Sequence, residues 1–310
     1  MQDVKIFSGS SHPRLAQEIA KNCGASLGKI QLETFSCGER YVRFKESFRG
    51  QSVFLVQTGR TDHMNDDLME LFFMINAAKQ SFAKKIHIIM PYMPYSRQDK
   101  IHEPREGISA KLVADLLIAA GADHIITVHL HTDQIQGFFS VPADNLNPSR
   151  LLIEYFQKKN IADAVVVSPD VGGAKSAKKF ADTLGVPLAI LHKYRPEHNK
   201  SRVSHVIGDV VGKTPILIDD MIDGAGSACN AREALIAAGA REESFLCATH
   251  AVFSGEAREK LNAANFSEII CTDTLPIENP PKNLVTISMA PLLADVIDHV
   301  VKNQSVSTLY

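Results

Sequence analysis

Three aspartates beside a short glycine-containing loop have the types and spacing best suited to chemistry. In the stretch ILIDDMIDGAGSACNAREAL, Asp219, Asp220 and Asp223 follow an apolar run and precede an alanine-rich helical pattern. Gly224 and Gly226 allow a backbone turn in which several N–H groups face one concavity at a helix N-terminus, where phosphate binds. Because carboxylates repel phosphate, we expect the aspartates to face sugar hydroxyls or a cation that the phosphates share.

A second acidic strand end and a pair of histidines follow the same logic. In VVVSPDVGGAKSAKKFAD, Asp170 precedes Gly172 and Gly173, although a tight strand-to-helix turn is an alternative interpretation. In HIITVHLHTDQIQGFF, His129 and His131 are two residues apart and would point to the same face of a strand. They indicate a metal or phosphate contact with Asp170 as a carboxylate partner, and a zinc hydrolase is the second hypothesis.

Positive charge is concentrated in two stretches that follow strand-like runs. PYSRQDKIHEPREG contains Arg97, Lys100 and Arg105, and LHKYRPEHNKSR contains Lys193 and Arg195. The second stretch is polar and has no apolar period, which predicts a mobile basic loop. Such loops close over the charge that develops in phosphoryl transfer, whereas a solvated charged turn is the alternative.

Elements that would position these residues alternate along the chain. Strand-like runs such as SVFLVQT, KIHIIMP, DAVVVSPD, LAILHK and PILIDD are separated by helical patterns. This alternation predicts an α/β fold with mostly parallel sheets flanked by helices. The segment LIAAGA occurs at 117–122 and again at 235–240, each time before a strand, which favours two similar halves. We place them at 1–146 and 147–310, divided near VPADNLNPSR.

Composition narrows the class of protein. The chain has 310 residues, 45% hydrophobic and 22% charged, with a formal net charge of -2. Without a basic excess, no nucleic-acid surface is expected, and no run reaches transmembrane length, so no membrane partner is expected either. The N-terminus lacks the pattern of a secretion signal, and the 5 cysteines have no CxxC spacing. These features predict a cytoplasmic protein.

The motifs together resemble those of the ribose-phosphate diphosphokinases, also called PRPP synthases. The resemblance rests on KIFSGSSHP, FSCGE, INAAK, PYSRQDK, GADHIITVHLH, QIQGFF, SPDVGGAK, HKYR, IDDMIDGAGS and FSG, in the family's order and spacing. It implies two tandem type I phosphoribosyltransferase-like domains and transfer of the β,γ-diphosphoryl group of ATP to the C1 hydroxyl of ribose 5-phosphate. It also implies Mg2+ as cofactor and a homo-oligomer, in the commonest class a hexamer built from dimers.

The resemblance assigns expected roles motif by motif. The ribose phosphate would bind at Asp219, Asp220, Asp223, Gly224, Ala225, Gly226 and Ser227. ATP would bind at Phe35, Cys37, Gly38, Glu39, Arg97 and Gln98, with the first four in a loop that reaches adenine across a subunit contact. Lys193 and Arg195 would be the catalytic basic pair, and His131 and Asp170 would bind the metal and the ATP phosphates. Positions near the family's regulatory site would be Ser47, Arg49, Ser305 and Ser307.

Several residues depart from the family pattern. His129 and Ser140 stand where the family usually has aspartate, and Cys37 replaces an Asp or Asn of the adenine loop. Gly224 replaces a threonine of the phosphate loop, and Phe82 replaces a small polar residue. Two further hypotheses follow: diphosphoryl transfer to a bulkier 5-substituted ribose such as ADP-ribose, because of Gly224, and a non-catalytic regulatory subunit, because of His129 and Ser140.

Overall fold

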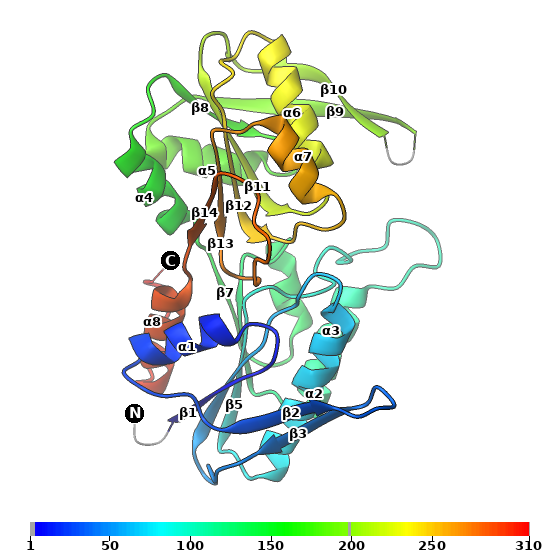
Figure 1. The fold of residues 1–310 in the computed structure, drawn as a ribbon, viewed down its shortest axis with the longest axis vertical. Coiled ribbons are helices and arrows are strands. Elements are labelled where there is room, and N and C mark those ends of the chain that lie inside the picture. The colour runs from blue at the N-terminus through cyan, green and yellow to red at the C-terminus, as the bar shows by residue number, and fades with distance from the viewer. Residues whose placement is uncertain (1–3, 198–199, 310) are drawn as a thin grey trace. The chain divides into compact units, whose positions relative to one another are not determined.

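The chain folds into two compact units, each a largely parallel sheet flanked by helices (Figure 1). The structure is a computed structural model that describes residues 4–197 and 200–309, with the side chains of 193–204 outside the described part. The first unit contains the residues up to Asn147 together with Thr274–Pro276 and those from Ser288 onward. The second contains Pro148–Asp273 and Ile277–Ile287. The predicted α/β class is confirmed.

The first unit is built on a five-stranded parallel sheet in the order β1-β4-β5-β6-β7. These strands are β1 Val4–Ser8, β4 Ser52–Val56, β5 Lys85–Met90, β6 His124–Val128 and β7 Ala143–Leu146. A separate antiparallel hairpin consists of β2 Ile30–Thr34 and β3 Arg40–Phe44. The helices are α1 Pro13–Asn22, α2 Met64–Gln80, α3 Ser109–Ala120 and α8 Ala290–Val301, with the 3-10 helix η1 Asp133–Phe138.

The second unit is built on a seven-stranded sheet in the order β10-β9-β8-β11-β12-β13-β14, parallel except for the β9–β10 pair. The strands are β8 Ala164–Ser168, β9 Leu188–Glu197, β10 Lys200–Ile207, β11 Thr214–Ile222, β12 Phe245–Ala251, β13 Glu268–Thr272 and β14 Leu284–Ile287. The helices are α4 Ser149–Lys159, α5 Ala174–Leu184, α6 Gly226–Ala237 and α7 Ala257–Ala264. Val165 and Val167 face one apolar core and Val166 faces another, so both faces of β8 are buried and its sequence is apolar throughout.

The end of the chain packs in the first unit. Helix α8 lies beside α1, and the thiol of Cys23 is 3.8 Å from the carbonyl oxygen of Ala294. Leu293 and Val296 of α8 are fully buried, because the apolar side of this helix faces the interior of the unit. The domain boundaries of 1–146 and 147–310 stay a prediction. By its contacts, α8 belongs to the first unit. No helix of the described ranges has the length and hydropathy needed to cross a bilayer.

The basic stretch after β8 is a strand rather than the predicted loop. Residues 188–197 form β9, which pairs with β10 across a register irregularity between Val203 and His205. Lys193 and Arg195 therefore have strand backbone, while their side chains lie outside the described part, as do residues 198–199. The sequence pattern indicated the apolar first part of this strand, LAILHK, where Ala189 and Leu191 are buried. It did not indicate the polar continuation to Glu197, because that part lacks the apolar alternation that usually marks a strand.

A buried polar chain crosses the first sheet. The Nδ1 atoms of His87 and His124 are 3.0 Å apart, and His124 Nε2 is 2.9 Å from Asp144 Oδ2. His87 also stacks on Phe54 with ring centroids 4.4 Å apart. Burial, followed by the neighbouring His124, lowers the pKa of His87 from 6.5 to about 4. His87 is therefore held neutral in the folded chain at neutral pH.

We expect this histidine to weaken the fold in mild acid. Below pH 6.5 the unfolded chain takes up a proton that His87 accepts in the folded chain only near pH 4, so unfolding becomes easier as the pH falls through that window. The loss is up to about 3 kcal/mol. Urea unfolding at pH 7.5, 6 and 5 should show a shallower decline for His87→Asn than for the wild type. Parallel declines would contradict this role.

Candidate functional site

Acidic side chains of the second unit lie where the strand order reverses. Strand β8 has β9 on one side and β11 on the other, so the chain leaves the middle of the sheet in opposite directions at this point. Open parallel sheets bind ligands at the carboxyl ends of strands at such a switch point. Asp170 follows β8, and Asp219 and Asp220 lie in the last part of β11, with Leu217 paired to Val167. The predicted residues Asp170, Asp219 and Asp220 are thus on neighbouring strand ends.

Their electrostatics indicate a cluster of like charge. Burial, followed by the neighbouring Asp220 and then Asp170, raises the pKa of Asp219 from 3.8 to about 8. The backbone N–H of Asp220 donates to Asp219 Oδ1 at 2.9 Å. A carboxylate in this position is relieved of repulsion when a cation or a hydroxyl donor approaches. The site therefore favours a ligand that brings positive charge or hydrogen-bond donors.

Asp170 also shapes its own turn. Its Oδ1 accepts a hydrogen bond from the N–H of Gly173 at 3.0 Å, and Ser168 Oγ donates to its carbonyl oxygen at 2.7 Å. A Cβ added at Gly173 would lie 3.0 Å from Ser168 Oγ, so a larger residue would push this turn open. The tight-turn interpretation is correct as structure. It is compatible with a functional role, because the turn fixes the carboxylate at the strand end.

The loop after β11 leads into an uncapped helix. Ala225 precedes α6 with φ 59°, and no side chain caps the helix N-terminus. The left-handed residue is therefore Ala225, and neither Gly224 nor Gly226 has a positive φ. A Cβ built at either glycine meets no heavy atom within 4 Å, so these residues leave the mouth of the loop open. The first N–H groups of α6, including that of Ser227, can bind an anion.

Ser254 is a site residue to which sequence analysis gave no role. Ser254 is the serine of the FSG motif, which contributed only to the family resemblance. Its hydroxyl donates a hydrogen bond to Asp223 Oδ1. The preceding Phe253 is fully buried with φ 50°, and its N–H donates to the carbonyl oxygen of Ile222 at 2.9 Å. This anchored turn brings Ser254 to the loop. The motif alone could not reveal the contact, because the two residues are far apart in sequence.

In the first unit, the predicted adenine loop is the tip of the β2–β3 hairpin. Phe35, Cys37, Gly38 and Glu39 are exposed, and Gly38 has φ 94°, which favours glycine. Two backbone hydrogen bonds close the tip: the N–H of Phe35 donates to the oxygen of Glu39, and that of Gly38 donates to the oxygen of Phe35, both at 2.8 Å. The Phe35 ring lies 5.6 Å from that of Tyr41.

Arg97 and Gln98 line a cavity of about 700 Å³ in the same unit. Its wall also includes His63, Asn65 and Asp66 from the start of α2, and Tyr95. The hydroxyl of Tyr95 donates to Asn65 Oδ1, and Ser109 Oγ donates to Gln98 Oε1. The size of the cavity suits a nucleotide-sized ligand. Sequence analysis identified Arg97 and Gln98 but missed the α2 wall, because nothing in its local pattern distinguishes it from an ordinary helix start.

The histidine pair does not lie on a strand. Strand β6 ends at Val128, and His129 has a left-handed φ of 46°. The expectation that His129 and His131 share one strand face is therefore wrong, since strand alternation ends before them. The N–H of His129 donates to the oxygen of Leu146 at 2.8 Å, and His131 is exposed. Within the described ranges, no group of three or more His, Cys, Asp or Glu has metal-site geometry.

The four predicted regulatory positions lie apart in sequence from the site residues above. The Arg49 guanidinium carbon is 4.1 Å from the centroid of the Phe82 ring, an exposed aromatic residue with φ 61°. The hydroxyls of Ser305 and Ser307 are 2.8 Å apart. Ser47 is exposed. A regulatory role for these positions stays a prediction.

Comparison with known proteins identifies the family. Residues 4–121 match the model for the N-terminal domain of ribose phosphate pyrophosphokinase, and residues 195–310 match the phosphoribosyl synthetase-associated domain. The ribose-phosphate pyrophosphokinase of Clostridium perfringens is 46% identical, covering 100% of this chain and 98% of the relative. That of Bacillus subtilis is 44% identical over 100% of this chain and 98% of the relative.

A solved structure agrees over nearly the whole length. The crystal structure of phosphoribosylpyrophosphate synthetase from Mycobacterium smegmatis has a TM-score of 0.91 and 45% identity, covering 97% of this chain and 99% of that chain. Fold and similarity together define an α/β transferase of nucleotide biosynthesis. The chain belongs to the ribose-phosphate pyrophosphokinase family.

Proposed function

We propose that the chain transfers the β,γ-diphosphoryl group of ATP to the C1 hydroxyl of ribose 5-phosphate, giving PRPP and AMP. The observation that carries this proposal is the open N-terminus of α6, a short loop after the strand that holds two adjacent carboxylates at the switch point of the second sheet. A phosphate at the helix and sugar hydroxyls at the carboxylates are the two ends of a ribose phosphate. Full-length identity to ribose-phosphate pyrophosphokinases supports the same reaction.

The residues of the chain divide the work of binding and transfer. In the proposal, Asp223 to Ser227 hold the 5-phosphate, and Asp219 and Asp220 hold the ribose hydroxyls. Arg97, Gln98 and the loop from Phe35 to Glu39 bind ATP. Lys193 and Arg195 stabilise charge on the transferring group, as positive side chains do in other phosphoryl transfers.

Magnesium fits the donor set of this chain. Burial, followed by the neighbouring carboxylates, raises the pKa of Asp219, and hard oxygen donors are the ligands that Mg2+ prefers. We propose metal-binding and ATP-phosphate-binding roles for Asp170 in the second unit and, separately, for His131 in the first unit. When bound, the ion supplies charge neutralisation on the phosphate oxygens.

The experiment that tests the function measures AMP release by the purified chain with ATP and magnesium. Parallel reactions contain ribose 5-phosphate, ADP-ribose or no acceptor. Turnover that requires ribose 5-phosphate is expected. The space at Gly224, where an added Cβ meets nothing, leaves room for a 5-substituent, so a higher kcat/KM with ADP-ribose would favour the larger acceptor. No release with either acceptor would favour a regulatory subunit.

Removing the hydroxyl of Ser254 should weaken acceptor binding. Ser254→Ala removes one charge-assisted hydrogen bond to Asp223, and the KM for ribose 5-phosphate should rise about tenfold while the KM for ATP stays unchanged. Steady-state kinetics with each substrate varied in turn measures both values. Ser254→Thr, which keeps the hydroxyl, should recover most of the loss. Equal rises in both KM values would contradict a local role.

We also infer a homo-oligomer, a hexamer built from dimers, from the family resemblance. Light scattering coupled to size-exclusion chromatography measures its mass, and a monomer at assay concentration would contradict the inference.

A further inference from the structure

The β2–β3 hairpin that carries the Phe35–Glu39 loop has few internal contacts to fix its orientation. Its two strands have five residues each, and isolated two-stranded hairpins are marginally stable in water. One face packs on the core of the first unit, since Ile30, Leu32, Val42 and Phe44 are partly buried against it. The next pair toward the tip on the same face is Thr34 and Arg40. The apolar contacts that hold the hairpin on the core therefore stop before the Thr34–Arg40 pair.

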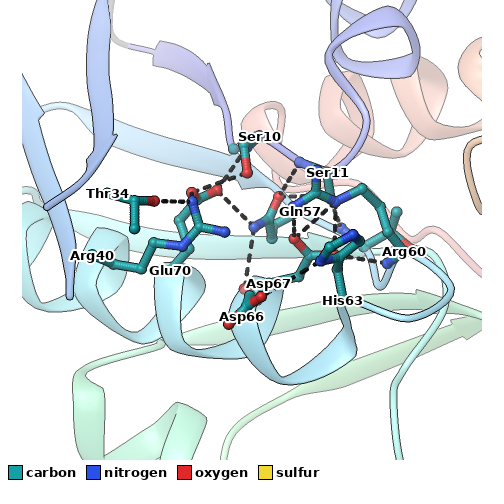
Figure 2. A network of polar contacts seen from close by, with 12 residues as sticks. Ser10, Ser11, Thr34, Arg40, Gln57, Arg60, His63, Asp66, Asp67 and Glu70 are labelled. Carbon is teal, nitrogen blue, oxygen red and sulfur yellow. Dashed lines mark hydrogen bonds and ion pairs between the residues drawn. The ribbon is translucent and has the colours of Figure 1, made fainter. Parts of the chain in front are cut away.

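Arg40 makes two contacts at this position. Its Nη1 donates to Thr34 Oγ1 at 2.9 Å, across the last strand pair before the loop. The same nitrogen lies 3.5 Å from Glu70 Oε2 on α2, and the side chains of Arg40 and Glu70 are 19% and 1% exposed. Figure 2 shows Arg40 between Thr34 and Glu70. One guanidinium thus joins the mouth of the loop to a buried carboxylate on another element.

Glu70 is a rigid attachment point. Its oxygens accept hydrogen bonds from the N–H of Ser10 at 2.7 Å, the hydroxyl of Ser10 at 3.0 Å and Gln57 Nε2 at 2.9 Å. Gln57 is itself held, because Ser11 donates to its carbonyl oxygen and it also donates to the backbone oxygen of Asp67 at 3.1 Å (Figure 2). Because this many donors fix the Glu70 carboxylate, its position does not depend on the hairpin. The ion pair therefore fixes the hairpin relative to Glu70.

The network continues to the cavity wall. Arg60 pairs with Asp67 at 2.7 Å, one turn from Glu70 on α2, and the N–H of Asp67 donates to the oxygen of His63 at 3.0 Å. His63 lines the cavity that contains Arg97 and Gln98. The first two turns of α2 therefore contain both Glu70, which pairs with Arg40, and residues that line the cavity with Arg97 and Gln98.

We propose that Arg40 is a positioning residue for nucleotide binding, which ties the β2–β3 hairpin to Glu70 and holds the Phe35–Glu39 loop in its binding orientation. This proposal rests on the proposed function in taking ATP as the ligand of that loop. Arg40 touches no reacting group. It acts by keeping the loop in the orientation that binds ATP. The apparent affinity for ATP falls in proportion to the fraction of molecules in which the loop has this orientation.

The test replaces Arg40 with methionine, which keeps the length of the side chain and removes its charge and donors. The KM for ATP should rise about tenfold, while kcat at saturating ATP and the KM for ribose 5-phosphate change by less than about twofold. Arg40→Lys should recover part of the ATP affinity, because an ammonium can pair with Glu70 but lacks the planar fork of guanidinium. Arg43→Met, an exposed position on the same strand, is the matched control and should behave as wild type.

A second readout does not depend on activity. Amide hydrogen exchange at Phe35 and Gly38 should become faster in Arg40→Met, whereas exchange in β4 and β5 stays unchanged and reports an intact fold. If the wild type releases no AMP, the proposed function fails, and calorimetric ATP binding with hydrogen exchange still decides the role of Arg40. Unchanged ATP affinity together with unchanged exchange at the hairpin tip would overturn the proposal, and so would a fall in kcat with no change in KM.

Discussion

Lys193→Ala should lower kcat by about 10³-fold or more while the KM for ATP changes by less than about threefold. The backbone position of Lys193 supports a role in stabilising charge on the transferring group. Ser168, the last residue of β8, pairs with Ile190, and β9 continues past it to Glu197, so Lys193 lies beyond the same end of the sheet as Asp170. Arg195 is two residues further along the strand. A positive charge needed mainly in the transition state affects kcat far more than binding.

Single-turnover kinetics with saturating ATP and ribose 5-phosphate measures the chemical step directly. Lys178→Ala is the control, since Lys178 is an exposed lysine of the same unit that pairs with Asp182. Arg195→Ala should also lose activity, and the double variant should lose less than the product of the two single effects, because both charges act on one group. A Lys193→Ala enzyme that loses ATP affinity in proportion to its rate would contradict a transition-state role.

Asp219→Asn should remove activity and make the protein more stable. Burial and the nearby carboxylates raise the pKa of Asp219 to about 8. A raised carboxyl pKa means that the stability present below pH 3.8 is lost as the pH rises to about 8, because the unfolded chain ionises first. Asparagine is neutral and avoids this loss. The Tm at pH 8 should therefore rise by about 4 °C, while kcat/KM for ribose 5-phosphate falls by about 100-fold or more.

The sign of this effect depends on pH, which provides its check. The stabilisation should shrink toward pH 4, where Asp219 is protonated in both states. Asp209→Asn is the matched control, because Asp209 is exposed and its pKa is lowered by Lys213, so this change should not raise the Tm. Magnesium should raise the Tm of the wild type more than that of Asp219→Asn. A lower Tm for Asp219→Asn at pH 8 would show that its carboxylate is already compensated in the folded chain.

Local patterns predicted the parts of the site that depend on local backbone. The order of strand, acid and glycine correctly predicted that Asp170 follows β8, because a buried strand followed by polar residues has few other structures available. Asp219 lies in the last part of β11, which continues to Ile222 rather than stopping at the acids. The same reasoning was wrong about the histidine pair, since His129 leaves the strand with a positive φ that no composition rule anticipates. It identified the apolar start of β9 but took its polar continuation past Lys193 for a loop.

Contacts between distant residues could not be predicted from the sequence. Arg40 and Glu70 are 30 positions apart, and Ser254 and Asp223 are 31 apart. Each pair forms only when two elements pack, and neither partner is unusual in its own segment. The turn at Ala225 is a milder case, in which glycines on both sides concealed the residue that adopts the left-handed conformation.

The place of α8 has a consequence for the growing chain on the ribosome. Helix α1 is synthesised early, but α8, which lies beside it in the first unit, is synthesised after the entire second unit. The part of α1 that contacts α8 therefore has no partner throughout the synthesis of the second unit. The second unit can complete its own sheet first, so the first unit, although begun earlier, is completed last. A chain stalled before Ala290 exposes an apolar surface that chaperones can bind.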